Sequence, residues 1–273
     1  MSDIATTTPA NQYNLREHAL ALLIESTPQI KCGGLANLLS HFQQNKVLVD
    51  TTQFLTTTKT IPGCPAKPVL VSPRGVKRRA MNTIEGRAAL IHALAHIEFN
   101  AVNLALDAVW RFADMPARYY EDWLKVASEE ACHFGLLNSH LHHIGYEYGS
   151  FDAHNSLWEM VDKTKADVLV RMALVPRTME ARGLDASPAL RAKLTQAGDH
   201  AAADILTIIL RDEIGHVAIG NIWYNWLCEQ RGLEPVATFK QLCAEYEAPK
   251  LKPPFNMEAR REAGFSDAEL ALL

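Results

Sequence analysis

A glutamate and a histidine three residues apart form the pattern that most constrains how this chain can fold. The pattern occurs twice, as Glu130-x-x-His133 and Glu213-x-x-His216, and each copy lies within a long stretch of helical apolar spacing. Residues three apart share one face of an α-helix, about 5–6 Å from each other. Each pair can therefore offer a carboxylate oxygen and an imidazole nitrogen to the same metal ion.

Two single glutamates precede the two pairs at nearly matched distances. Glu98 comes before Glu130, and Glu180 comes before Glu213 by almost the same number of residues. Two glutamates plus two Glu-x-x-His pairs are the ligand set of a dinuclear metal site inside a four-helix bundle. The sequence thus predicts an all-α fold in which six side chains face one another: Glu98, Glu130, His133, Glu180, Glu213 and His216.

Four long helices are predicted from the apolar spacing and its breaks. Asn82 is the candidate N-cap of the first helix. Pro176 is expected to kink the third helix one turn before Glu180, because proline removes a backbone hydrogen bond. Gly183 and Asp185 are expected to interrupt that helix. The predicted ranges are 82–112, 117–144, 164–182 with a continuation over 188–197, and 199–230.

The turns between these helices place the predicted ligands at one height. Residue 114, in the first turn, is midway between Glu98 and Glu130. Residues equally far from an antiparallel turn lie side by side, because both helices rise about 1.5 Å per residue. The midpoint of Glu180 and Glu213 falls beside Gly198. The second pair is therefore level too, provided that 188–197 continues the direction of the third helix.

The remaining segments divide the chain into three expected regions. Residues 1–80 are an N-terminal helical and extended arm that packs on the bundle, 81–231 are the bundle itself, and 232–273 are a C-terminal helical extension. Within the arm we expect a loose tail over 1–13, short helices over 15–25 and 35–42 separated by a Gly33-Gly34 break, and an extended path over the proline-rich 51–79. Residues 145–163 are long enough to cross the bundle from end to end. One more helix is expected over 237–247.

The predicted ligands indicate which metals the site suits. Burying four unpaired carboxylates in an apolar interior is very costly, and two divalent cations would balance their charge. Mixed oxygen and imidazole ligation suits iron or manganese. We expect two metal ions, with iron favoured and manganese or a mixed pair as alternatives, and with Glu130 and Glu213 as the bridging ligands. The alternative interpretation is six separate residues at the surface or in ion pairs.

Two acids next to the pattern have two possible roles. Glu129 and Asp212 each lie four residues before the histidine of their own helix, on the same face. Either acid can orient an imidazole by accepting a hydrogen bond from it, or can be an ordinary solvated acid.

Composition narrows the class of protein. The chain is 48% hydrophobic and 21% charged, as is typical of soluble globular proteins, and its net charge of −4 does not favour a broadly basic nucleic-acid-binding surface. The five scattered cysteines form no Cys-x-x-Cys pair, so we expect free thiols, a buried one at Cys132, and a cytoplasmic location. No apolar run reaches about 18 residues, so no membrane span is expected.

Four runs of the sequence carry a resemblance: His96-Ile97-Glu98, Glu129-Glu130-x-x-His133-Phe134, Glu180-Ala181-Arg182-Gly183-Leu184-Asp185 and Asp212-Glu213-Ile214-Gly215-His216-Val217. They are similar to an uncharacterised bacterial family of the ferritin-like superfamily of di-iron carboxylate proteins. The chain is more distantly similar to the di-iron tRNA hydroxylase and to rubrerythrin-like proteins. The resemblance implies the ferritin-like fold, with a long crossover between the second and third helices, and the six ligands. It implies no particular substrate.

Three functions are compatible with such a site. The favoured one is a dinuclear-iron oxidoreductase that uses dioxygen to hydroxylate or oxidise an unknown small-molecule or nucleoside-type substrate, with an unknown electron donor. The second is iron handling, as in ferritins, and the third is a non-catalytic scaffold stabilised by its metals. A surface helix pair is also compatible with a homodimer. No catalytic residue is assigned beyond the ligands.

Overall fold

The structure is a computed structural model that describes residues 13–77 and 79–273. The described chain is mostly helical, which confirms the all-α prediction. The only strands in the described ranges, β1 (Tyr13–Asn14) and β2 (Val47–Leu48), form one short parallel pair that the sequence did not predict. Nearly all of the tail predicted over 1–13 lies outside the described residues.

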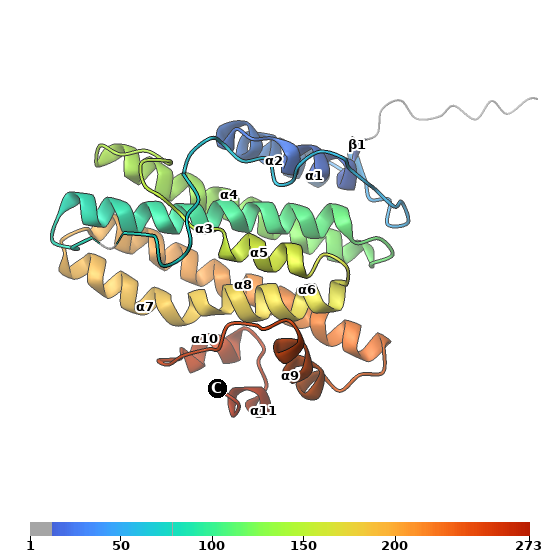
Figure 1. Ribbon diagram of the computed structural model, residues 1–273. Coiled ribbons are helices and arrows are strands. Elements are labelled where there is room, and N and C mark those ends of the chain that lie inside the picture. The colour runs from blue at the N-terminus through green and yellow to red at the C-terminus, as the bar shows by residue number, and fades with distance from the viewer. Residues whose placement is uncertain (1–12, 78) are drawn as a thin grey trace, which may run out of the picture.

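Long helical segments lie side by side along the molecule (Figure 1). They are α3 (Ile84–Arg111), α4 (Ala117–His143), α8 (His200–Gln230), and a composite segment of α6 (Val168–Leu174), the π-helix η1 (Val175–Glu180) and α7 (Ala181–Gln196). Helix α3 packs along α4, α7 along α8, and α4 along α8. The first turn contains Asp114 with φ +58°, and the second contains Gly198 with φ +79°. These two turns fold the chain into two antiparallel helix pairs.

The first long helix begins one residue later than predicted. Thr83, rather than Asn82, is the N-cap, because its side chain accepts a hydrogen bond from the backbone N–H of Gly86. The N-cap of α8 is Asp199, whose side chain accepts from the N–H of Ala202. The other predicted ends of the long helices agree with the structure to within a few residues.

The third helical segment corrects one prediction. The chain runs through Gly183 and Asp185 without a break, and Pro188 also lies inside α7. A glycine inside a helix costs only about 1 kcal/mol, which packing can offset. The Asp185 carboxylate does not compete for the helix backbone, because it accepts hydrogen bonds from Arg260. At Pro176, where a kink was expected, the backbone leaves the α-helical pattern and forms the π-helix η1.

Shorter elements cover the long helices. Helices α1 (Leu15–Ile24) and α2 (Pro28–Gln43) pack on α3 and α4. Helix α2 passes through Gly33-Gly34, so the break predicted there was wrong; Pro28 begins the helix at a position where a missing N–H costs nothing. The crossover after α4 contains a helix that was not predicted, α5 (Ser156–Lys163). Helices α9 (Pro235–Glu245), α10 (Met257–Glu262) and α11 (Asp267–Leu270) lie against the second helix pair (Figure 1).

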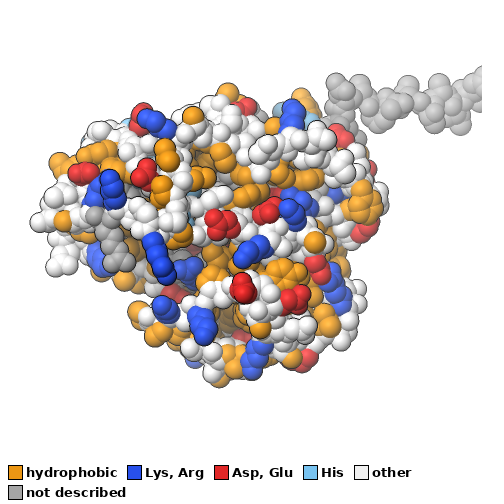
Figure 2. All heavy atoms as spheres, in the orientation of Figure 1, with side chains coloured by type: hydrophobic (Ala, Val, Ile, Leu, Met, Phe, Trp, Pro, Cys, Tyr) orange, Lys and Arg blue, Asp and Glu red, His pale blue; other side chains and the backbone are white. Residues whose placement is uncertain are grey.

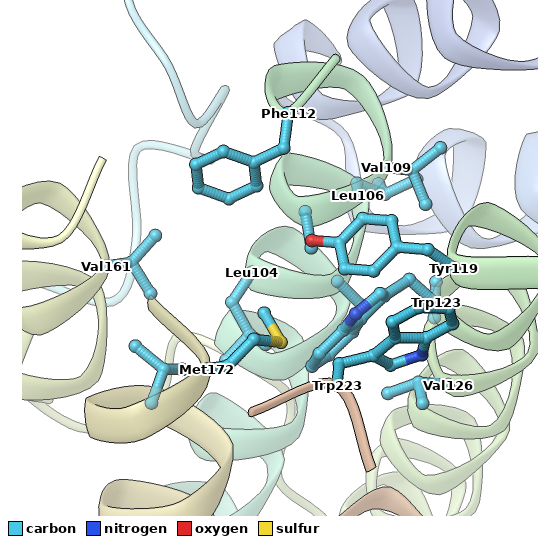
Figure 3. Packing of buried hydrophobic residues seen from close by; sticks show 14 of the residues in the cluster. Leu104, Leu106, Val109, Phe112, Tyr119, Trp123, Val126, Val161, Met172 and Trp223 are labelled. Atoms are coloured by element: carbon cyan, nitrogen blue, oxygen red, sulfur yellow. The ribbon is translucent and has the colours of Figure 1, made fainter. Parts of the chain in front are cut away.

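Two apolar clusters fill the space between the long helices. The larger one contains aromatic side chains of α3, α4 and α8, including Tyr119, Trp123 and Trp223, packed against Met172 of α6 (Figure 3). The smaller one contains residues such as Phe99, Phe134 and Leu206. A buried ion pair joins the helix pairs beside the larger cluster, with Arg171 Nη1 2.6 Å from Asp107 Oδ2.

One helix of the described chain, α3, is long and apolar enough to cross a membrane, although it contains no long uninterrupted apolar run. Most of its apolar window, 72%, is buried inside the protein. Helix α3 therefore passes this test of length and composition as a helix of the protein core.

Candidate metal centre

All six side chains singled out from the sequence are buried, and they come from four different helical segments. Glu98 lies on α3, Glu130 and His133 on α4, and Glu213 and His216 on α8, while Glu180 is the last residue of η1. None is more than 8% exposed. Five of the six lie along their helices between residues of the two apolar clusters, and Glu98 lies beside Phe99 of the smaller cluster. This burial excludes the surface half of the alternative, whereas the ion-pair half is compatible with the histidine–carboxylate contacts of the group.

Glu130 is at the middle of the group. Its Oε2 lies 3.3 Å from His133 Nδ1, and its Oε1 lies 2.9 Å from His216 Nδ1. The two imidazole rings are tilted against each other, with centroids 5.8 Å apart. One carboxylate of α4 therefore contacts a histidine from each of the two helix pairs.

The other glutamates surround this central carboxylate. Glu98 Oε2 is 3.3 Å from His133 Nδ1, and Glu213 Oε2 is 3.8 Å from His216 Nδ1. Glu98, Glu130, His133 and Glu213 each offer one ligand atom within 4.8 Å of the others, a spacing that one metal ion can span. Glu180 is buried beside them, and neither of its carboxylate oxygens has a hydrogen-bond partner.

Glu129 and Asp212 both contact an imidazole, but each contacts the histidine of the opposite helix. Glu129 Oε2 is 2.9 Å from His216 Nε2, and Asp212 Oδ2 is 3.1 Å from His133 Nε2. In each case a protonated Nε2 donates to the carboxylate, and Nδ1 is the nitrogen that faces the buried glutamates. The role in orienting the imidazoles is therefore supported, and the solvated alternative is not.

A surface cation binds each of these two acids. Lys125 Nζ lies 2.7 Å from Glu129 Oε2, and Arg211 Nε lies 2.8 Å from Asp212 Oδ1. The same chain of cation, carboxylate and imidazole thus occurs twice, and in each case the cation and the acid lie on one helix and the imidazole on the other. The two cations could have been found from the sequence. Lys125 lies four residues before Glu129, on the same helix face, and Arg211 directly precedes Asp212.

The pKa values show how the group balances its charge with protons. Burial raises the pKa of Glu98, Glu180 and Glu213, and the neighbouring carboxylates raise it further. Burial alone would lower the pKa of His133, but hydrogen bonds with Glu130 and Glu98 outweigh it and raise the pKa to about 11. The pKa of Glu130 is lowered against the effect of burial, because the two imidazoles surround it. Protons on the acids and histidines therefore neutralise the buried negative charge, as bound cations would.

Unpaired atoms show that protons alone do not satisfy the group. Thirteen buried side-chain nitrogen or oxygen atoms in the described residues have no hydrogen-bond partner, and six of them belong to Glu98, Glu130, Glu180, Glu213 and His216. Buried polar atoms are almost always paired in proteins. Several of these atoms lie close together without hydrogen-bond geometry, as expected of lone pairs that point at a common cation. Carboxylates and imidazoles are donors that suit divalent iron and manganese, and four of the six groups, Glu98, Glu130, His133 and Glu213, lie within reach of one ion, whereas Glu180 and His216 lie outside that set.

Comparison with known proteins gives the family of the chain. The sequence model of DUF455, described as a protein of unknown function, matches residues 24–271. The chain belongs to the DUF455 family. It is 46% identical over 254 residues to a protein of Haemophilus influenzae described as uncharacterized, and the match covers 90% of this chain and 88% of the relative. No solved structure matches.

The DUF455 match includes both helix pairs, all six buried ligand candidates, the two orienting acids and the three C-terminal helices. The family match therefore extends well beyond the helices that carry the site and includes most of the segments that cover these helices.

Proposed function

We propose that the four long helical segments form a ferritin-like four-helix bundle that holds two metal ions. The ligands are Glu98, Glu130, His133, Glu180, Glu213 and His216, and the metals are iron, manganese or one of each. One observation carries this proposal: acidic and imidazole side chains from four helical segments meet in the interior, and neither carboxylate oxygen of Glu180 has a hydrogen-bond partner there. Burying such a group costs far less when cations neutralise the carboxylates.

The six ligands would hold the metals from two sides. Glu130, whose two oxygens face the two histidines, would hold them from the centre of the group. Glu98 and His133, which lie 3.3 Å apart, would hold them from the first helix pair. Glu180, Glu213 and His216 would hold them from the second.

The function that this site supports best is that of an oxidoreductase that uses dioxygen to hydroxylate or oxidise an organic substrate. Two iron ions held there would activate dioxygen, with an external reductant restoring the electrons that they give up. The chain's own residues hold the imidazoles in place through Glu129 and Asp212. The two apolar clusters keep bulk water away from the ligands. A dry, fixed site of this kind is what dioxygen chemistry requires.

The test is to load the protein with ferrous iron without oxygen, and then to admit air while recording the optical spectrum. The proposal predicts a visible and near-ultraviolet absorption of the ferric pair that bleaches on reduction and returns with air. Uptake of many irons per chain into a high-mass assembly would indicate storage instead. A bound metal pair that never changes oxidation state would indicate a scaffold.

A further inference from the structure

A second site lies on the other side of η1, in a cavity of about 490 Å³ between this π-helix and the C-terminal segments. Arg177 and Thr178 of η1 form one wall, and residues of α9 and of the C-terminal stretch form the others. Side chains such as Val236, Phe239 and Leu251 make much of its lining apolar. The volume is in the range of cavities that hold small organic ligands, about 300–1,000 Å³.

The lining carries more positive than negative charge. Its basic side chains are Arg177, Arg260, Lys240 and Lys250, and its only acidic side chain is Glu269. The two lysines are exposed and are in no ion pair of the described chain. In Figure 2, basic and hydrophobic side chains lie next to each other over this C-terminal part of the molecule. A ligand that fits such a lining has a negative group and an apolar body.

Arg177 gives a specific place for the negative group. It is 1% exposed, and one of its terminal nitrogens donates to Glu269. Its guanidinium stacks on aromatic rings, with the carbon 4.2 Å from the Tyr224 centroid and 5.0 Å from that of Phe239. Its Nε has no acceptor, and it is the only unpaired buried side-chain donor among the described residues of this lining. A buried donor without an acceptor is costly, and an anionic ligand would satisfy it.

We propose that this cavity binds an amphipathic anion, a hydrocarbon chain with one carboxylate or phosphate group. The apolar walls take the chain, and Arg177 with Lys240 and Lys250 takes the headgroup. A neutral chain would leave Lys240, Lys250 and the Nε of Arg177 without a partner, and a cationic one would be repelled by the lysines. This proposal stands apart from the metal centre, because none of the residues that carry it is a proposed metal ligand.

Cys243 offers a direct way to detect the ligand, because its thiol lines the cavity. The rate at which N-ethylmaleimide modifies Cys243 is measured by peptide mass spectrometry, with and without dodecanoate, dodecyl phosphate, dodecanol or dodecyltrimethylammonium below their micelle concentrations. Cys64 and Cys132, which are both exposed, serve as internal references. The anions are expected to slow modification of Cys243 about tenfold and to leave the references unchanged.

The two anions separate the possible headgroups. Protection by dodecanoate alone assigns a carboxylate, and protection by dodecyl phosphate alone assigns a phosphate; both results support the proposal. Equal protection by dodecanol or by the cation would overturn it, and so would no protection by either anion.

Charge-reversal variants test the headgroup site itself. Lys240→Glu combined with Lys250→Glu is expected to raise the anion concentration needed for protection about tenfold or more, because the attraction of both lysines becomes repulsion. The matched control is Lys59→Glu combined with Lys193→Glu, which makes the same change in net charge at exposed lysines outside the cavity. The control is expected to behave as the wild type. If the two double variants bind the anion equally well, the proposal is wrong.

Discussion

At the scale of single residues, the two histidines are held by acids from the opposite helix. The sequence predicted which acids and histidines belong to the site, because helical spacing puts them on one face of each helix. It did not predict which acid serves which imidazole. Glu129 reaches His216, and Asp212 reaches His133, and this exchange depends on how α4 and α8 cross. Spacing along one helix contains no information on that crossing.

These contacts give a first prediction. Glu129→Gln and Asp212→Asn are each expected to weaken metal binding about 10- to 100-fold, since loss of the acid behind a metal-bound histidine typically has this effect. Metal affinity is measured by competition with a chelator, and helix content by circular dichroism. Glu121→Gln is the control, because Glu121 lies on the same helix α4 and its ion pair among the described residues is with Arg118. Unchanged affinity in both acid variants would contradict the assigned role.

Another residue-scale feature is a buried lysine. Lys31 of α2 is fully buried and donates to Asn103 Oδ1 and to the carbonyl oxygen of Gly63. Burial lowers its pKa from 10.5 to about 8, although the charges of Cys64, Cys32 and Glu25 act in the opposite direction. Nothing in the sequence indicated this burial, because lysine is almost always at the surface.

The buried lysine predicts a pH dependence of stability. Between pH 8 and 10.5 the unfolded chain keeps a proton on Lys31 that the folded chain has lost. Stability rises with pH wherever the unfolded state binds more protons. The free energy of unfolding of the wild type minus that of Lys31→Met is therefore expected to rise through this window, as measured by urea denaturation. The same difference for the exposed Lys193→Met should stay flat. A flat difference for Lys31→Met as well would show that its pKa is not lowered.

At the scale of elements, the composite segment α6–η1–α7 shows what sequence reasoning can and cannot supply. The distortion at Pro176 was predictable, because proline breaks the helical hydrogen-bond ladder wherever it stands in a helix. The continuity through Gly183 and Asp185 was not, because it depends on the C-terminal Arg260, which binds Asp185 from a distant part of the chain. The break expected at Gly33-Gly34 does not occur either, and there Gly34 packs so closely on Leu22 of α1 that a Cβ would lie 2.5 Å from its Cδ2.

Close packing at η1 leads to a prediction for α8. A Cβ at Gly220 would lie 2.4 Å from Pro176 Cβ, which real atoms do not tolerate. Gly220→Ala is therefore expected to destabilise the protein by about 1–3 kcal/mol, because η1 and α8 must move apart. Gly135→Ala is the control on α4, where a Cβ meets nothing within 4 Å; it should be neutral or stabilising by up to about 1 kcal/mol. Equal unfolding free energies for the two variants would contradict the packing described here.

At the scale of the whole molecule, the sequence predicted the arrangement of the two helix pairs better than it predicted the arrangement of the segments around them. Equal distances from the two turns predicted that the glutamates meet, and the structure brings Glu98, Glu130 and Glu213 together. The C-terminal cavity was not predictable, because its walls come from η1, α9 and the end of the chain, which share no sequence pattern.

The prediction of a buried thiol at Cys132 was wrong, because Cys132 is exposed. A small difference in the rotation of a helix decides on which side of it a single thiol lies.

The central claim is that the buried acids and imidazoles hold metal, and metal content tests it most directly. Protein produced in medium rich in iron and manganese is analysed for metals per chain by mass spectrometry, as wild type and as Glu130→Ala combined with His133→Ala. Circular dichroism shows whether the variant keeps its helices, and Glu159→Ala on α5 controls for loss of a carboxylate elsewhere. The account predicts two ions per chain in the wild type and in the control, and none in the helical double variant. Two ions per chain retained by that variant, or a wild type that binds none, would contradict it.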